Sequence, residues 1–562
     1  MCDGTQNFKK RTLFFIDFSP ISVPGTQNLA KIMPEQPISL AQHYHDRTKY
    51  DPETLRTKAQ QSLDWSRQPS PFKDYKIGTS IELRSYIEQQ PSVVADPAVN
   101  LESSPESSPA ANPDPNLQFW QRLSRFLYYS YGITGVIPTA SGSHYLRSSP
   151  SAGGLYPAEL YLISRGTPLL AAGLYNYQAQ SHSLMHFWDN EVWTALQSSC
   201  FWHPALEATQ FALVVTGVFE RSAWRYQDRA YRRIFLDSGH LLGNLELAGS
   251  INDFRPHTIS GFCDSAINDL LYLDDRLEST LAVLPIADLQ HLNQHLSRHE
   301  SALPSATART YSTRIPDGQL LDTLHQATQI PMHDRAVAWT HPNPLPDRPD
   351  KYNFPFCLKI DMTSRPIVWE SHLTGLEDTL LKRRSTRSYN GTDITLNELK
   401  AILDFTYHPE HYIEQNLDPY PDYCDLNRVE TFIAVSGVTG LESGCYYYAP
   451  HLQELRQIRF KNFRSELHFL CLGQELGRDA VAVIFHTADL TAAIDQWGDR
   501  AYRYLHLDAG HLGQRLNLAA IRLGLGISGI AGFFDDEVNQ VLGIPEDEAV
   551  LYITTIGRAR RE

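Results

Sequence analysis

Apolar residues recur every three or four positions along 505–523, a spacing that predicts one long amphipathic helix. Gly524-Leu-Gly-Ile-Ser-Gly529 follows, and we interpret its glycines as the helix cap and a tight turn. Segments rich in β-branched and aromatic residues predict strands at Glu159–Ser164, Ala480–His486 and Ala549–Ile556. Helices mixed with strands in this way indicate an α+β fold.

The long helix belongs to a sequence that occurs twice. Asp228–Asp264 aligns without a gap with Asp499–Asp535 at a constant offset of 271 residues, and nearly half of the positions are identical. This period is far longer than that of a solenoid repeat, so it indicates the duplication of a whole domain. Two such copies in one chain are expected to pack as a two-fold pseudo-dimer.

Stretches without a repeating apolar pattern separate the two copies. Residues 1–41 show no periodicity, and 42–300 form the first copy, interrupted at about 89–116 by a Ser/Pro-rich insert that we expect to be disordered. A linker rich in Pro, Thr and His covers 301–370, and 371–562 form the second copy.

Composition excludes several classes of protein. The 562 residues include 49 basic and 64 acidic ones, a net charge of −15 that argues against a nucleic-acid or anionic-membrane binder. No apolar stretch approaches the ~20 residues of a spanning helix. Seven cysteines without a CxxC pair are typical of reduced thiols. We therefore expect a cytoplasmic enzyme.

Two short motifs could bind an anion or a planar ring. Arg383, Arg384, Ser385 and Arg387 offer guanidinium and hydroxyl donors suited to phosphate, although a solvated basic turn would look the same. The small-residue loop Pro150–Gly154 leaves backbone N–H groups accessible, although it could be a plain turn. Gly524–Gly529 matches G-x-G-x-x-G, but a helix precedes it where a dinucleotide fold requires a strand.

In combination these motifs, with Gly557-Arg558 near the end, resemble those of nitroreductase-like flavoenzymes. More narrowly, the chain resembles the SagB-type dehydrogenases, which include the cyanobactin thiazoline oxidases. The resemblance implies two fused nitroreductase-like domains, FMN at their interface, and oxidation of azoline rings to azoles in a ribosomally made peptide, with dioxygen as the final acceptor. It also implies an azoline-containing peptide as partner, with its cyclodehydratase as a second candidate; further homodimerisation stays open.

The two copies lack complementary parts of the family's flavin site. The second copy has the Arg-rich motif but Asp425–Glu430 in place of the small-residue loop, and the first copy has the loop but no Arg-rich motif. We therefore expect one composite FMN site per chain and an empty second site. The expected ligands are Arg383, Arg384, Ser385, Arg387 and Arg558 for the phosphate, Pro150, Ser151, Ala152, Gly153 and Gly154 at the ring edge, and Gly529, Ile530, Ala531 and Gly532 through backbone groups.

The expected acid–base residue departs from the family pattern. Related azoline dehydrogenases often carry Lys-Tyr where this chain has Arg225-Tyr226. Arginine is a poor base, so Tyr226 with Arg225 beside it is the candidate, against a structural role for either residue. His240 and His511, at equivalent positions, are expected to pack. The spacing of His43-Tyr-His45-Asp46 could suit a metal, but no matching Cys/His/Glu cluster is recognised elsewhere, so no metal site is expected in the chain.

Two other functions remain open from the sequence. One is an NAD(P)H-dependent reductase of nitro or quinone compounds, which would share the flavin site. The other is a flavin-free scaffold that binds a peptide or a partner enzyme.

Overall fold

A computed structural model of the chain describes residues 39–53, 55, 63–88, 114–139, 142–290, 299–305, 315–332, 351–353 and 355–560. All of them belong to one structural unit, Ile38–Glu562. Most of the expected N-terminal segment 1–41, most of the insert 89–116 and much of the linker 301–370 lie outside the described residues.

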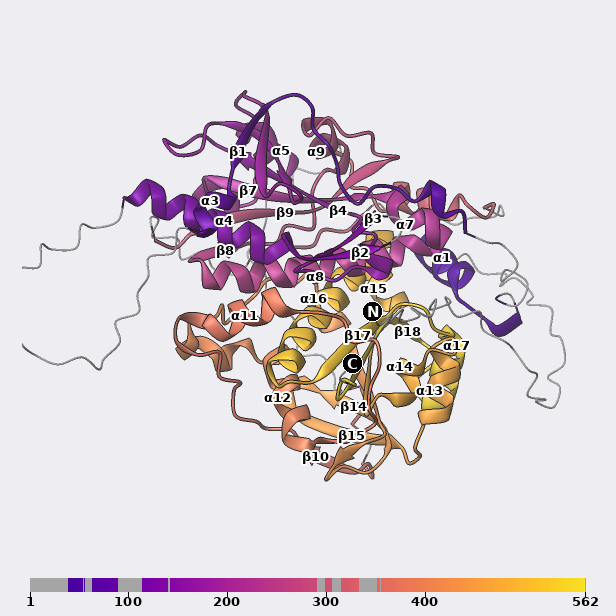
Figure 1. Cartoon of the computed structure of the whole chain (residues 1–562). Coiled ribbons are helices and arrows are strands. Elements are labelled where there is room, and N and C mark those ends of the chain that lie inside the picture. The colour runs from indigo at the N-terminus through magenta and orange to yellow at the C-terminus, as the bar shows by residue number, and fades with distance from the viewer. Residues whose placement is uncertain are drawn as a thin grey trace, which may run out of the picture. The chain divides into compact units, whose positions relative to one another are not determined.

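Each copy contains a seven-stranded sheet, and the two sheets have the same strand order (Figure 1). The first runs β1-β6-β5-β4-β7-β9-β8 and the second β10-β15-β14-β12-β16-β18-β17, with antiparallel pairing throughout. The strands of the first sheet are β1 (Thr79–Glu82), β4 (Ala158–Ser164), β5 (Gly173–Gln178), β6 (Ser183–Trp188), β7 (Phe211–Val218), β8 (Phe254–Pro256) and β9 (Glu278–Asp288). Those of the second are β10 (Lys359–Asp361), β12 (Glu430–Val435), β14 (Gly444–Ala449), β15 (Glu454–Arg459), β16 (Ala482–Asp489), β17 (Gly526–Ile530) and β18 (Glu548–Gly557).

Helices cover these sheets, and two short strand pairs lie outside them. The longer helices are α1 (Leu40–Thr48), α4 (Pro115–Tyr131), α7 (Phe219–Tyr226), α8 (Ala230–Ile251), α10 (Leu320–Ala327), α11 (Thr374–Lys382), α12 (Leu396–Tyr407), α15 (Leu490–Trp497), α16 (Ala501–Arg522) and α17 (Asp535–Leu542). The shorter helices are α3 (Arg84–Glu88), α5 (Trp193–Ser199), α6 (Ala205–Ala208), α9 (Asp264–Leu270), α13 (Arg464–Leu470) and α14 (Glu475–Asp479). The additional strands are β2 (Ile133–Thr139) with β3 (Gly142–Arg147), and β11 (Ile394–Thr395) with β13 (Val438–Thr439).

The two repeated helices, α8 and α16, lie side by side between the sheets (Figure 1). They approach most closely where Gly239 of α8 faces Gly510 of α16. A Cβ at Gly239 would lie 2.1 Å from the Leu507 carbonyl oxygen, and one at Gly510 would lie 2.3 Å from the Leu236 carbonyl oxygen. Glycine is required at both positions because backbone meets backbone there. The expected α+β pseudo-dimer is confirmed.

Buried ion clusters repeat the same two-fold relation. Arg229 and Arg232 of the first copy contact Asp535 of the second at 2.9 and 2.7 Å. Their counterparts 271 residues later, Arg500 and Arg503, both contact Asp264 of the first copy at 2.6 Å. All six side chains are at most 3% exposed. The two copies are therefore joined by reciprocal contacts, as in a two-fold homodimer.

One local interpretation from the sequence is wrong. Only Gly524, at φ +71°, makes the expected turn; Gly526–Ile530 form β17, which pairs with β18 at the edge of the second sheet. The glycines hid the strand because they lack the β-branched signal on which strand prediction depends. Within this strand, Gly529 leaves room for the Tyr552 side chain of the neighbouring strand β18.

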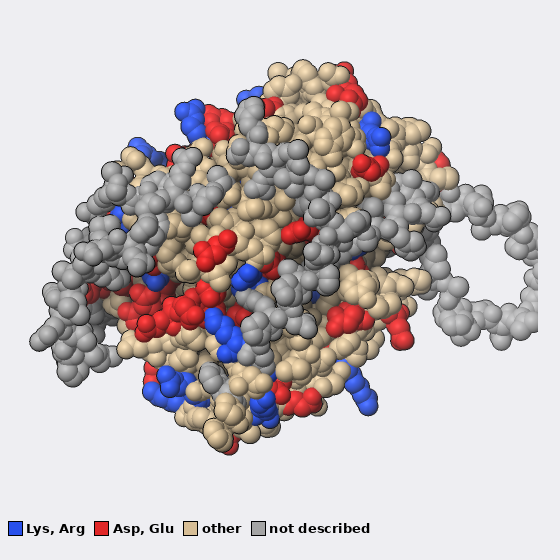
Figure 2. Space-filling model, turned by 180° about the vertical axis from the view of Figure 1, so that it is seen from behind, with Lys and Arg blue, Asp and Glu red and all other residues tan. Residues whose placement is uncertain are grey.

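No described helix is both long and apolar enough to cross a membrane. In the view from behind, acidic side chains gather in a band across the middle of the surface with basic ones beside them (Figure 2). This mixed surface is consistent with the net charge of −15.

Candidate functional site

A cavity of about 650 Å³ lies between the two copies, a size typical of small-molecule sites. The first copy lines it with Ile137, His144, Leu146, Pro150, Ser151, Ala152, Gly153, Gly154, Tyr156, Arg233, Leu236, Asp237 and His240. The second copy lines it with Arg383, Arg384, Ser385, Arg387, Ser528, Gly529, Ala531 and Tyr552. The structure thus brings the Arg-rich motif of one copy against the small-residue loop of the other.

Five of the expected residues do not line this cavity. Ile530 and Gly532 alternate with the lining residues Gly529 and Ala531. The guanidinium of Arg558 instead donates to the Glu398 carboxylate at 3.0 Å. Arg225 and Tyr226, at the end of α7, lie behind the small-residue loop.

Arg383 is a buried cation of the cavity. It follows α11 directly and is 3% exposed. Its Nε donates to the Ser148 carbonyl and its Nη2 to the Arg147 carbonyl at 3.1 Å, whereas its buried Nη1 has no partner among the described residues. Burial lowers the pKa of Arg383 to about 10, so it stays charged at neutral pH. A buried charge with an unused donor favours a bound anion.

Two neighbours add positive charge at the same end of the cavity. Arg384 donates from Nη2 to the Thr134 carbonyl at 2.7 Å, which ties the β2–β3 hairpin to the second copy. Arg387 is exposed at the rim, and Ser385 is half-buried between them. Three guanidinium groups and a hydroxyl therefore surround one end of the cavity.

The small-residue loop at the other end is held by Asp237 of α8. The Ser151 hydroxyl donates to Asp237 Oδ2 at 2.6 Å, and the Ala152 N–H donates to the same carboxylate at 3.1 Å. Burial raises the pKa of Asp237 to about 7. Gly153 and Gly154 have φ of +66° and +67°, a left-handed conformation that favours glycine.

Both glycines also allow larger side chains to approach the loop. A Cβ at Gly153 would lie 2.9 Å from the Tyr226 hydroxyl and 3.0 Å from Arg225 Nη1. A Cβ at Gly154 would lie 2.6 Å from His144 Cε1. Tyr226 and His144 therefore both contact the loop at adjacent residues.

The floor of the cavity is a chain of hydrogen bonds that crosses between the copies. A Cβ at Gly529 would lie 1.7 Å from the Tyr552 hydroxyl, so only glycine fits beside that ring. Tyr552 donates to His240 Nε2 at 2.9 Å, and His240 Nδ1 donates to Gln514 Oε1 at 2.9 Å. Burial lowers the pKa of His240 to about 4, so its ring is neutral. Both ring nitrogens of His240 make hydrogen bonds inside the protein, in line with the structural role expected from the sequence.

Several lining residues were missed by sequence reasoning, among them His144, Arg233, Asp237 and Tyr552. A signal existed for two of them inside the aligned repeats. Asp237 has a counterpart in Asp508, which indicates a shared structural task. Arg233 aligns with Tyr504, so the guanidinium is specific to the copy whose cavity is open. His144 and Tyr552 lie outside the aligned blocks, and no motif marked them.

The related position on the other side of the pseudo-dimer is built from different residues. Asp508 accepts the Cys424 N–H at 2.9 Å and the Asp425 N–H at 2.8 Å, as Asp237 accepts the N–H of Ala152. Here, however, the Tyr423 ring stacks on His511 at 4.3 Å between centroids, and Trp497 Nε1 donates to Asp425 at 3.0 Å. Large and acidic side chains stand where the open cavity has serine, alanine and glycine.

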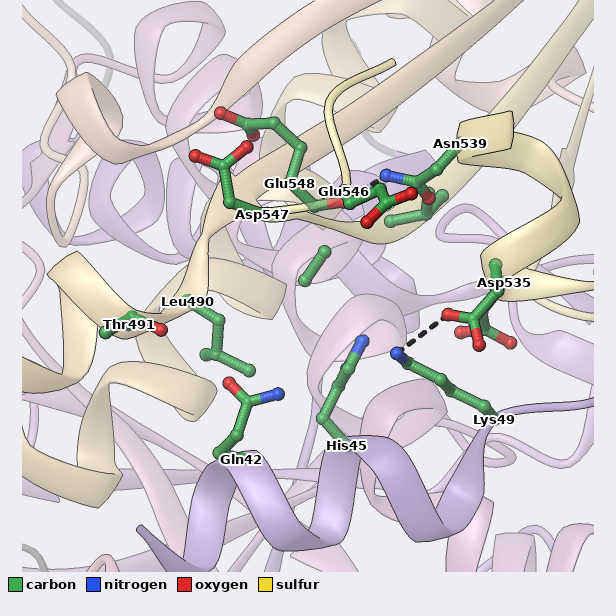
Figure 3. A pocket seen from close by; sticks show the side chains of 13 residues that line it. Gln42, His45, Lys49, Leu490, Thr491, Asp535, Asn539, Glu546, Asp547 and Glu548 are labelled. Carbon is green, nitrogen blue, oxygen red and sulfur yellow. Dashed lines mark hydrogen bonds and ion pairs between the residues drawn. The ribbon is translucent and has the colours of Figure 1, made fainter. Parts of the chain in front are cut away.

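A second cavity, of about 200 Å³, lies where α1 meets the second copy (Figure 3). His45 and Lys49 line it from α1, and Asn539 lines it from α17. Lys49 Nζ pairs with Asp536 at 2.8 Å, and the Asn539 amide donates to two backbone carbonyls at 2.6 and 2.7 Å. The Lys49–Asp536 ion pair holds the end of α1 against the second copy, whereas the Asn539 bonds stay within that copy. The motifs expected from the sequence gather in the 650 Å³ cavity, which is therefore the candidate site.

The histidines of α1 do not converge on a common point. His45 Nδ1 lies 3.2 Å from the Tyr502 hydroxyl inside the interface, and burial lowers its pKa well below the usual value. His43 is half-buried on α1. Their arrangement is that of packed histidines.

Comparison with known proteins decides the family. The model of the nitroreductase family matches residues 136–287 and 380–558, which together make up more than half of the chain. The chain belongs to the nitroreductase family. The two matched segments fall in the two copies, so this nitroreductase carries its fold twice.

Solved and curated relatives agree with this assignment. A crystal structure of a "putative nitroreductase" from Anabaena variabilis is 61% identical, covers 93% of this chain and all of that one, and has a TM-score of 0.84. "Putative nitroreductase MJ1384" of Methanocaldococcus jannaschii is 33% identical over 171 residues, which are 30% of this chain and 85% of that protein.

Two further relatives are named for the processing of trifolitoxin and of microcin B17. The trifolitoxin-processing protein TfxB of Rhizobium leguminosarum is 28% identical over 33% of this chain and 50% of its own length. The microcin B17-processing protein McbC of Escherichia coli is 28% identical over 25% of this chain and 54% of its own length. The match thus spans about half of each, and it confirms the SagB-type resemblance among the nitroreductases.

Proposed function

We propose that this nitroreductase is an FMN-dependent dehydrogenase with one composite flavin site per chain, in the 650 Å³ cavity. The observation that carries the proposal is Arg383, a buried cation whose Nη1 has no hydrogen-bond partner among the described residues. Arg384 and Arg387 add further positive charge beside it, and no ion pair joins Arg383 to a carboxylate in the described part of the chain. A phosphate would supply a counter-ion.

The other cavity residues fit the rest of an FMN molecule. Ser385 and Arg387 would join Arg383 at the phosphate, because hydroxyl and guanidinium groups donate to phosphate oxygens. The loop Pro150–Gly154 would lie against the ring edge, with Gly529 and Ala531 contributing backbone groups. Arg233 adds a buried Nε without a partner. Bound FMN would supply a two-electron acceptor.

The proposed substrate is an azoline ring in a ribosomally made peptide, oxidised to an azole with dioxygen as the final acceptor. The similarity to TfxB and McbC, both named for processing peptide products, supports this choice. Conversion of an azoline to an azole removes two electrons and two protons, so a residue must accept the acidic ring proton. We propose that a cyclodehydratase installs the ring beforehand, and that both enzymes act in the reducing cytoplasm.

We propose Tyr226 and His144 as the two candidates to exchange that proton. Each lies against a glycine of the loop, and the Tyr226 ring is covered by the Arg233 guanidinium at 3.7 Å from its centroid. His144 reaches the same loop from the β2–β3 hairpin, at Gly154.

Replacement of Tyr226 by phenylalanine is expected to lower turnover of an azoline peptide about 100-fold or more while FMN stays bound, because general acid–base groups contribute at least that factor. His144→Gln separates the two candidates. The measurement is single-turnover oxidation as a function of pH, with flavin content as the control. Full activity of Tyr226→Phe together with a lost pH limb in His144→Gln would assign the proton to His144.

The number of flavins per chain tests the site itself. One FMN per chain is expected, measured by absorbance after denaturation and identified by mass, because the opposite position is filled by Tyr423 and Asp425. Two per chain would contradict the composite site, and none after reconstitution would favour a peptide-binding scaffold. Rapid reduction of the flavin by NAD(P)H in stopped flow, without peptide oxidation, would favour the nitro- or quinone-reductase alternative.

A further inference from the structure

Two histidines and a glutamate, none of which lines the cavity, come together at the end of α12. His408 caps α12, and Glu410 and His411 belong to the 3-10 helix Pro409–Gln415 that follows. Each offers one potential metal-ligand atom, and these atoms all lie within 4.8 Å of one another. Among the described residues, no other group of three His, Cys, Asp or Glu side chains does so.

The geometry points to a binding site for one first-row divalent metal ion of the zinc class at His408, Glu410 and His411. Two imidazole nitrogens and one carboxylate oxygen form a donor set that suits Zn²⁺, Co²⁺ or Ni²⁺ better than Ca²⁺ or Mg²⁺. The side chains of Glu410 and His411 are 44% and 32% exposed, so an ion can enter and water can complete its coordination.

The buried carboxylate of Asp404 orients the His411 imidazole for metal binding. His411 Nδ1 lies 2.7 Å from Asp404 Oδ1, and Asp404 is 2% exposed. Asp404 also accepts the Tyr412 hydroxyl at 2.9 Å, which fixes the carboxylate in place. Because a carboxylate only accepts, the proton of His411 is on Nδ1 and its Nε2 lone pair is left for a metal. This carboxylate–histidine arrangement is typical of metal sites.

The second imidazole is oriented by a hydroxyl on the opposite side. His408 Nε2 lies 3.4 Å from the Tyr448 hydroxyl, and His408 Nδ1 lies 3.0 Å from Glu410 Oε1. The Tyr448 hydroxyl can accept a hydrogen bond from a protonated Nε2, and in that tautomer the Nδ1 lone pair can bind a metal beside Glu410. The ion would take the place of the proton that His408 and Glu410 share.

The backbone limits how far these ligands can separate. The His408 N–H donates to the Asp404 carbonyl at 2.9 Å, and the His411 N–H donates to the His408 carbonyl at 3.1 Å. His408 is the N-cap of the 3-10 helix, and its ring stacks on that of His411 at 5.1 Å between centroids, so both imidazoles lie on the same side of the turn. Binding there would join the end of α12 to the turn that follows it.

The test is a zinc titration of the untagged full-length chain after treatment with a chelator. Isothermal titration calorimetry is expected to show one Zn²⁺ per chain, and Co²⁺ is expected to give the visible absorption of a low-symmetry site. His411→Ala is expected to abolish both signals. Asp404→Asn, which alters only the orienting group, is expected to weaken zinc binding about 10- to 100-fold.

His451→Ala, which removes an exposed histidine from another turn, is the matched control and should bind zinc as the wild type does. Circular dichroism of each variant shows whether it has folded. The inference is overturned if the wild type binds no zinc, or if His411→Ala, folded, binds as tightly as His451→Ala. Neither result bears on the flavin site, whose cofactor is measured separately.

Discussion

The double variant Arg383→Ala, Arg387→Ala is expected to purify without flavin. Arg383 is only 3% exposed, and its Nη1 has no hydrogen-bond partner among the described residues. Without it and Arg387, two of the three positive charges at the phosphate end are lost. Charge-assisted hydrogen bonds to an anion contribute about 1.5–3 kcal/mol each, so affinity should fall by at least a factor of 100.

Flavin retained per chain after desalting is the measurement, with the dissociation constant from fluorescence titration of free FMN. The matched control is Arg428→Ala. Arg428 lies in the loop of the opposite, filled position, where it contacts Gln496, so its removal should leave flavin content unchanged. A yellow double variant would show that the phosphate lies elsewhere, and a colourless Arg428→Ala would show that the filled position also binds.

Asp535→Asn is expected to destabilise the chain by about 3–5 kcal/mol, the cost of leaving a buried ion pair without one partner. Asp535 holds two guanidinium groups from the other copy, both at most 3% exposed, and it also accepts the Tyr50 N–H at 3.1 Å. Asp264→Asn removes the equivalent carboxylate of the first copy and should cost a similar amount. Urea unfolding at neutral pH measures both.

The neighbouring residue provides the control. Asp536 is largely exposed and pairs with Lys49, so Asp536→Asn should cost no more than about 1 kcal/mol. Equal effects of Asp535→Asn and Asp536→Asn would contradict the interpretation that the buried clusters join the two copies.

The buried ion clusters at Asp535 and Asp264 make the free energy of unfolding depend on pH. Arg229 and Arg232 hold the pKa of Asp535 below its ordinary value near 4, and Arg500 and Arg503 do the same for Asp264. The stabilisation is therefore present above the ordinary carboxyl pKa and is lost as the pH falls through the lower pKa of the folded state. In the Asp535→Asn variant, the loss of stability below pH 4 should be shallower.

The sequence determined the architecture of this protein because the repeat is visible in it. Equivalent residues 271 apart, such as Asp237 and Asp508, occupy equivalent places, and the long apolar stripe predicted α16. The Arg-rich motif and the small-residue loop were also recognisable, since phosphate binding and close backbone approach require particular residue types. Their complementary distribution over the two copies indicated a shared cavity before its walls were known.

Only the tertiary structure decided which side chains face that cavity. Arg558 carries the expected charge, but its ion pair with Glu398 directs it away, and that contact joins residues 160 positions apart. His144 and Tyr552 line the cavity because the β2–β3 hairpin and strand β18 bring them there, which no local pattern encodes. The strand β17 was mistaken for a turn because its glycines accommodate side chains that are distant in sequence, Tyr552 at Gly529 and Thr386 at Gly526. Local spacing specifies elements, whereas the contents of a site between two copies depend on contacts across the interface.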